Sequence, residues 1–133
     1  ATATAARYAD LAEKYTSDEN YDPGTVLELG GIAEVTQTRR PTSLAIAGIV
    51  STDPAYLMNS DSEGISVALI GRVPCRVIGP VHKGDLIVSS EMPGFGCAAD
   101  PETVKPGTII GKAITALSPG GMDGVVEVMV GRC

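Results

Sequence analysis

Residues 65–78 read ISVALIGRVPCRVI, a run rich in valine and isoleucine. Such β-branched residues favour strands, and the run predicts a strand over Ile65–Leu69 with Arg72–Ile78. Cys75 stands inside the apolar alternation, which is typical of a small buried core residue. Pro74 cannot donate to a sheet ladder, so it marks an edge or a bulge, and an open edge there would invite pairing with another chain.

Outward from this run, the chain reads as short strands separated by turns. The 133 residues include 16 Gly and 9 Pro, and only 4% are aromatic. Separators such as Gly30-Gly31, Pro93-Gly94 and Pro106-Gly107 are turn signals. We expect further strands at Thr25–Leu29, Ala33–Thr36, Ala45–Ser51, Asp85–Ser89, Thr108–Leu117 and Val125–Val130.

Three short words occur twice in the same order, and each contains a glycine. Residues 23–27 (PGTVL) match 83–87 (KGDLI), residues 47–50 (AGIV) match 110–114 (IGKAI), and residues 69–72 (LIGR) match 129–132 (MVGR). The order predicts two pseudo-repeated β-units at about 23–78 and 83–132. We therefore expect an all-β domain over 21–133, a compact barrel or sandwich in which each unit covers the other's apolar face.

The first 20 residues differ from the rest. Residues 1–6 are small and polar, whereas Tyr8, Leu11, Ala12 and Tyr15 are spaced as one stripe of a short helix over residues 7–15. We expect a tail and helix that act as an oligomerisation or linker segment. The stripe packs either against copies of itself about a three-fold axis or back onto its own barrel.

Charge and composition exclude several classes of function. The net charge is −6, and Arg39-Arg40 is the only adjacent basic pair, which argues against nucleic-acid binding. No apolar run reaches 18 residues, so we expect no membrane span. With one histidine, His82, and three cysteines (75, 97 and 133) in no metal-binding spacing, we expect no metal and no cofactor. The odd cysteine number weakly favours a reducing compartment.

Candidate catalytic residues are few. Self-cleavage needs a hydroxyl nucleophile beside a base, and Ser17 with Asp18 or Glu19 offers both near the start of the chain. The threonines Thr2 and Thr4 are further candidates. The beginning at Ala1 without a Met fits cleavage just before it and fits a cloned fragment equally well. The same Ser17-Asp18-Glu19 group is typical of an acidic turn.

Several longer words resemble a known family. They are YADLAE (8–13), PGTV (23–26), GIVSTDPAYLM (48–58), VALIGRVPCRV (67–77) and KGDL (83–86). Together they resemble a C-terminal domain of virion structural proteins of tailed phages, annotated on tail fibres or tail-associated proteins. The likeness runs from Tyr8 to Arg132. It extends more distantly to the autoproteolytic intramolecular-chaperone domains of phage appendages.

The resemblance implies a non-enzymatic module at the end of a trimeric fibre or spike, which aids oligomerisation or caps the fibre. Its partners would be further copies of itself and other virion proteins, and it would be assembled in the host cytoplasm into the virion. Two alternatives stay open: a self-cleaving chaperone domain, and a module that binds a host receptor or glycan. For glycan binding, Tyr56 is the candidate because sugar sites use aromatic rings.

Two arginines follow the matched glycines. Arg72 and Arg132 come directly after Gly71 and Gly131. In this acidic chain we expect each to pair with a carboxylate such as Asp85, Glu28 or Glu127, with little net gain in stability if the pair is exposed.

Overall fold

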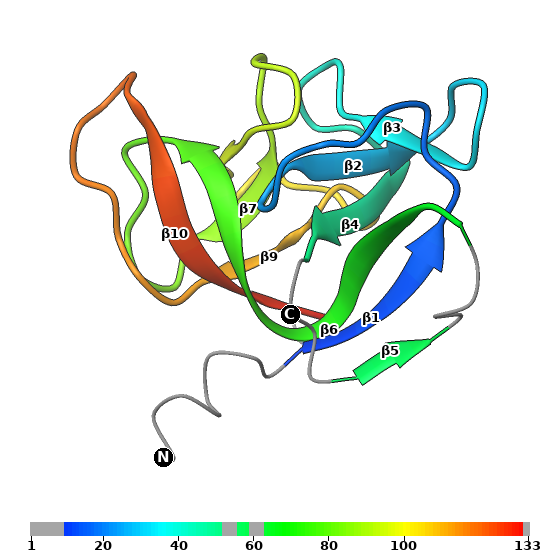
Figure 1. The fold of residues 1–133 in the computed structure, drawn as a ribbon. Helices are drawn as coiled ribbons and strands as arrows, with labels where there is room; N and C mark the ends of the chain where they lie inside the picture. The colour runs from blue at the N-terminus through cyan, green and yellow to red at the C-terminus, as the bar shows by residue number, and fades with distance from the viewer. Residues whose placement is uncertain (1–9, 52–55, 59–62, 132–133) are drawn as a thin grey trace, which may run out of the picture.

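The computed structural model describes residues 10–51, 56–58 and 63–131, and the described residues form ten β-strands and no helix (Figure 1). The domain is therefore all-β. The strands are β1 (Asp10–Tyr15), β2 (Val26–Leu29), β3 (Val35–Gln37), β4 (Ile46–Val50), β5 (Tyr56–Met58), β6 (Ile65–Ile78), β7 (Leu86–Ser89), β8 (Gly96–Ala98), β9 (Gly111–Ala113) and β10 (Asp123–Val130).

The 14-residue strand β6 runs through the whole molecule (Figure 1). Its first half pairs with β1 on one edge and with β4 on the other. Its second half pairs with β10 and, near its end, with β8. One strand thus carries two separate sets of neighbours.

The later strands form a closed barrel of five. Starting from the second half of β6, the ladders run to β8, β7, β9 and β10, and β10 returns to β6. Because the ring closes, none of these strands is left with a fully open edge. The barrel alternative of the predicted fold is the one observed.

The earlier strands repeat this arrangement. The first half of β6 pairs with β4, β4 with β2, β2 with β3, and β1 returns to β6. This ring closes through one parallel bridge between Ser17 and Val35. The bridge occupies the position that the parallel β6–β8 ladder has in the barrel. Antiparallel and parallel pairs fall at the same places in both sets. We call β1–β4 with the first half of β6 the first unit, and the barrel the second unit.

The matched glycines lie at matching places in the two units. Gly24 and Gly84 precede β2 and β7 with φ of 87° and 89°. Gly48 and Gly111 lie in β4 and β9. Gly71 lies in the middle of β6, at the end of its first half, and Gly131 comes directly after β10. By strand pairing, however, the matching segments begin at β1 and at Arg72, since residues 72–78 belong to the barrel. The predicted pseudo-repeats were 23–78 and 83–132, whereas strand pairing places residues 72–78 with the second unit.

The short N-terminal helix was predicted wrongly for residues 10–15. They form β1, which pairs in parallel with β5 and antiparallel with β6. Ala12 is fully buried, while Leu11 and Tyr15 are half-buried within the same chain. A helix of nine residues is marginal alone, whereas β6 offers a long edge whose hydrogen bonds a strand satisfies. Residues 7–9, with Tyr8, lie outside the described residues.

Two hydrophobic clusters form the core. The larger cluster draws on both units: Val26, Ile49 and Ala68 from the first pack with Val77, Ile87 and Val128 from the second. The smaller cluster contains Leu27, Val35, Val50, Ile65 and Val67, all from the first unit.

Details of β6 agree with the sequence. Cys75 is fully buried, and burial raises the pKa of its thiol to about 12. Arg72 pairs with Glu127 at 3.1 Å, as expected, whereas Arg132 lies outside the described residues. Pro74 faces Glu127 of β10, and it lies between the end of the β4 ladder at Ala68 and the start of the β8 ladder at Val77. In this stretch the N–H of Arg76 donates to the carbonyl oxygen of Gly24 at 2.9 Å, and no ladder on this side of β6 includes Pro74, as expected of a residue without an N–H.

Candidate functional site

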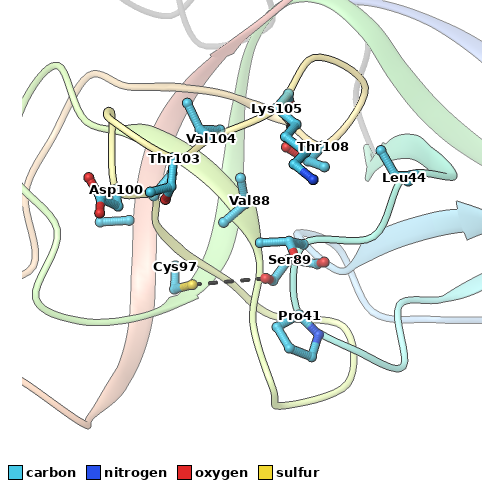
Figure 2. A pocket seen from close by; sticks show the side chains of 13 residues that line it. Pro41, Leu44, Val88, Ser89, Cys97, Asp100, Thr103, Val104, Lys105 and Thr108 are labelled. Carbon is cyan, nitrogen blue, oxygen red and sulfur yellow. Dashed lines mark hydrogen bonds between the residues drawn. The ribbon is translucent and has the colours of Figure 1, made fainter.

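The connection from β3 to β4, residues 38–45, separates two surface hollows. The first, the inter-unit hollow, has a volume of about 520 Å³ (Figure 2). It lies where this connection meets β7, β8 and the β8–β9 connection of the second unit. Its lining consists of Pro41, Thr42, Leu44, Val88, Ser89, Cys97, Ala98, Ala99, Asp100, Thr103, Val104, Lys105 and Thr108.

Ser89 of β7 holds the connection in place. Its buried hydroxyl donates to the carbonyl oxygen of Arg40 at 2.9 Å and accepts from the N–H of Ser43 at 2.8 Å. The Ser89 carbonyl oxygen accepts from the N–H of Thr42 at 3.0 Å. Thr42 has a φ of 48°, which is unfavourable for a β-branched residue, so the surrounding bonds impose this conformation.

The walls of the inter-unit hollow combine aliphatic residues with serine and threonine, and only Asp100 and Lys105 carry a charge. Figure 2 shows Val88 amid the labelled side chains, with Asp100 and Thr103 to one side and Leu44 to the other. An oxygen of Asp100 already accepts from the N–H of Glu102, at 2.9 Å. The Cys97 thiol is half-buried, and burial, with a smaller effect of Glu91, raises its pKa. A raised thiol pKa lowers the reactive thiolate fraction, so this hollow suits an apolar group better than nucleophilic chemistry.

The second hollow, which we call the Glu28 hollow, has a volume of about 430 Å³. Its lining consists of Glu28, Leu29, Arg39, Arg40, Thr42, Ser43, Leu44 and Ala45. Glu28 is only 3% exposed, and its Oε2 lies 3.5 Å from Nε of Arg39. No described group forms a hydrogen bond with the buried Oε1 of Glu28. A carboxylate oxygen held in this way is unusual, because burial removes its water without replacing it.

Aliphatic side chains surround the Glu28 hollow on the surface. Leu29 is 55% exposed and Leu44 is 71% exposed, and both line the hollow. The N–H of Leu29 donates to the carbonyl oxygen of Ala45 at 2.8 Å, which places Leu29 beside the residue that follows Leu44. Ile32, in the turn after β2, is 96% exposed. We call these three exposed side chains, of which Leu29 and Leu44 line the hollow, the aliphatic patch.

The Ser17-Asp18-Glu19 group forms a turn that closes the first unit. The Ser17 hydroxyl donates to the carbonyl oxygen of Glu19 at 2.7 Å. The Asp18 carboxylate accepts from Tyr21 at 2.8 Å and from Thr36 at 2.9 Å. Among the described residues, no carboxylate forms a hydrogen bond with the Ser17 hydroxyl. Thr2 and Thr4 lie outside the described residues.

The other predicted site residues are dispersed. Leu11, Ala12 and Tyr15 lie along β1, and the Tyr15 hydroxyl donates to Glu13 at 3.0 Å. Their predicted role in oligomerisation stays a prediction. Tyr56 lies in β5, where its backbone pairs with Leu11, and its side chain is outside the described part of the chain. These residues do not line either hollow.

Sequence reasoning missed both hollows. It noted Arg39-Arg40 as the one adjacent basic pair and Glu28 as an ion-pair candidate, but it did not join them. The signal was weak, because Glu28 and Arg39 are 11 residues apart and Ser89 is 46 residues beyond Ser43. Only strand pairing brings these segments together.

Comparisons with known proteins supply no relative. No known protein family matches the chain, and no curated protein matches it. Within the described ranges, no three His, Cys, Asp or Glu side chains gather in a way that would hold a metal ion. The same residues contain no helix long and apolar enough to cross a membrane.

Proposed function

We propose that this chain is a non-enzymatic assembly module of a phage virion protein, at the end of a tail fibre or spike. The observation that supports the proposal is the aliphatic patch. Leu29 and Leu44 line one hollow, and Ile32 follows Leu29 by three residues in the chain. Exposed apolar side chains scattered singly are ordinary, whereas a group of them favours a contact surface for another protein. The sequence resemblance to virion domains supplies the biological setting.

The patch provides a physical reason to associate. Burial of a valine- or leucine-sized side chain contributes about 1.5–3 kcal/mol relative to full exposure. Ile32 is almost fully in water in this chain, so contact with a second copy would recover most of that stabilisation. Because association also orders side chains and removes rotational freedom, the patch accounts for part of an interface and needs neighbours around it.

In this proposal the first partner is another copy of the chain, with a closed trimer favoured, and the further partners are other virion proteins. The chain would be assembled in the host cytoplasm and reside in the virion. The fold serves this role by presenting the β2–β3 turn and the β3–β4 connection on a rigid β scaffold.

The test is the solution mass by light scattering over a range of concentrations. We expect a trimer whose dissociation is promoted by the double substitution Ile32→Asp with Leu44→Asp, because two charges would enter the interface. Met122→Asp is the matched control, since Met122 is also exposed but lies in the turn before β10. It should leave the mass unchanged.

A strictly monomeric wild-type chain would refute self-driven assembly. A trimer that dissociates equally with the control substitution would show that the aliphatic patch is not the contact surface. Circular dichroism of each variant establishes that the barrel is intact, so that a change in mass reports association.

A further inference from the structure

We infer that the Glu28 hollow binds the carboxyl-terminal residue of a polypeptide, with an aliphatic last side chain. Leu29 and Leu44 line this hollow and also belong to the aliphatic patch, so a bound peptide and a second copy of the chain would compete for them. The peptide is therefore tested at a concentration at which light scattering shows the chain to be monomeric. The proposed site rests on one buried acceptor without a donor, one cation without a partner, and two aliphatic walls.

The acceptor is Oε1 of Glu28. The side chain is 3% exposed, and Oε1 is shielded from water without a donor among the described residues. Arg39 contacts only the other oxygen, at 3.5 Å, the upper limit for a hydrogen bond, and its side chain is 61% exposed. Arg39 therefore holds Glu28 weakly, and its displacement would leave the Glu28 carboxylate free to turn towards a donor of a ligand. A group that donates N–H to Oε1 would satisfy it.

The cation is Arg40. Arg40 lines the same hollow, and no described carboxylate forms an ion pair or hydrogen bond with its guanidinium. The Arg40 backbone is fixed by the hydroxyl of Ser89, so the side chain starts from a rigid position. A guanidinium binds a carboxylate through two parallel hydrogen bonds. Two arginines and one glutamate line the hollow, so its lining carries a net positive charge and favours a ligand that is itself an anion.

The walls identify the class of anion. Leu29 and Leu44 flank the hollow, and none of the described residues that line it is aromatic. Sugar acids are usually stacked on aromatic rings, whereas an aliphatic side chain packs on leucine. A chain terminus carries all three features within one residue: a carboxylate for Arg40, an amide N–H for Glu28 and an aliphatic side chain for the leucines. The volume of about 430 Å³ accommodates one or two residues.

The experiment titrates the intact chain with acetyl-Gly-Gly-Leu as the free acid, followed by isothermal calorimetry and by amide NMR shifts. The C-terminal amide of the same peptide and D-glucuronate are the comparison ligands. We expect saturable binding of the free acid with shifts at residues 28–29 and 39–45. Arg40→Ala should weaken it roughly tenfold or more, as for loss of a charge-assisted pair. Glu28→Gln should also weaken it, and Lys83→Ala, a matched exposed cation, should not.

Several results would overturn the inference. They are no binding of the free acid, equal binding of the amide, or an Arg40→Ala variant that binds like the wild type. Binding of D-glucuronate in place of the peptide would assign the site to sugar acids. Because Arg40 is exposed, its variant tests the site even if Glu28→Gln disturbs the fold.

Discussion

Gly48 lies where β4 and β6 approach so closely that a methyl group does not fit. A Cβ atom there would lie 2.6 Å from Cγ1 of Val67 and 2.7 Å from the carbonyl oxygen of Ala68. Gly111 has the same surroundings in the second unit, against Val128 and the carbonyl oxygen of Met129. The match between Gly48 and Gly111 in the sequence is thus explained by close backbone approach at the corresponding place in each unit.

At this scale we predict that Gly48→Ala lowers the free energy of unfolding by about 1–3 kcal/mol, because the added methyl forces backbones apart. The φ of 153° at Gly48 adds strain. Gly120→Ala is the control, since a Cβ there would meet only Cδ of Pro80, at 3.5 Å. It should change stability by less than about 0.5 kcal/mol. Urea unfolding measures both, and equal effects would contradict this account.

Among the elements, β1 shows how one sequence satisfies two periodicities. The apolar residues Leu11, Ala12 and Tyr15 fit a helical stripe, yet the segment is a strand because β6 and β5 pair with it on both sides. The end of β1 is then fastened to β3. The N–H of Val35 donates to the carbonyl oxygen of Thr16 at 3.0 Å, and Asp18 accepts from Thr36 of β3.

Asp18 makes this closure dependent on pH. Partial burial raises the pKa of its carboxyl, but the hydrogen bonds from Tyr21 and Thr36 outweigh that effect and hold the pKa below its ordinary value of 3.8. The folded state therefore favours the carboxylate. Its contribution to stability is complete above the unfolded pKa and is lost as the pH falls through the folded pKa.

We predict that Asp18→Asn lowers the unfolding temperature at pH 6 and that its difference from wild type shrinks as the pH falls from 4 towards 2. Asp22→Asn is the control, because the described residues give the Asp22 side chain no hydrogen bond. A difference between wild type and Asp18→Asn that is constant with pH would contradict the assignment. Thermal unfolding followed by circular dichroism at several pH values measures it.

The whole molecule consists of two like units that share one strand and one main core. Because β6 is continuous through both, unfolding of one unit would free one half of a strand whose other half stays paired in the other unit. The larger core cluster also joins the units, with Ile49 from the first and Val128 from the second in one set of contacts. We therefore treat the chain as a single cooperative unit.

We predict one calorimetric transition for the domain. Leu27→Ala, in the smaller cluster, and Val77→Ala, in the larger, should each lower the temperature of that same transition, with about 2–5 kcal/mol lost for Leu27→Ala. Two separate transitions, each responding to one substitution, would show that the units unfold independently.

Sequence patterns predicted most strands but not all. The segments at β2, β4, β6, β7 and β10 were placed within a few residues, because each is an apolar run bounded by glycine or proline. Of the predicted strand Thr108–Leu117, only β9 (Gly111–Ala113) forms. Beyond it, the N–H of Glu127 donates at 2.8 Å to the side-chain hydroxyl of Thr115 and not to a backbone carbonyl oxygen. The three-residue strands β5 and β8 were missed. The equally short β3 and β9 overlap the predicted runs Ala33–Thr36 and Thr108–Leu117, which are longer than the strands themselves.

By itself, the sequence determined the all-β class, the turns, the buried Cys75 and the repeated glycines. These properties depend on local periodicity and on residue chemistry that act over a few neighbours. The tertiary structure decided that residues 10–15 form a strand and that Glu28, Arg39 and Arg40 share a hollow. Such outcomes depend on which distant segments pair, and no local pattern carries that information.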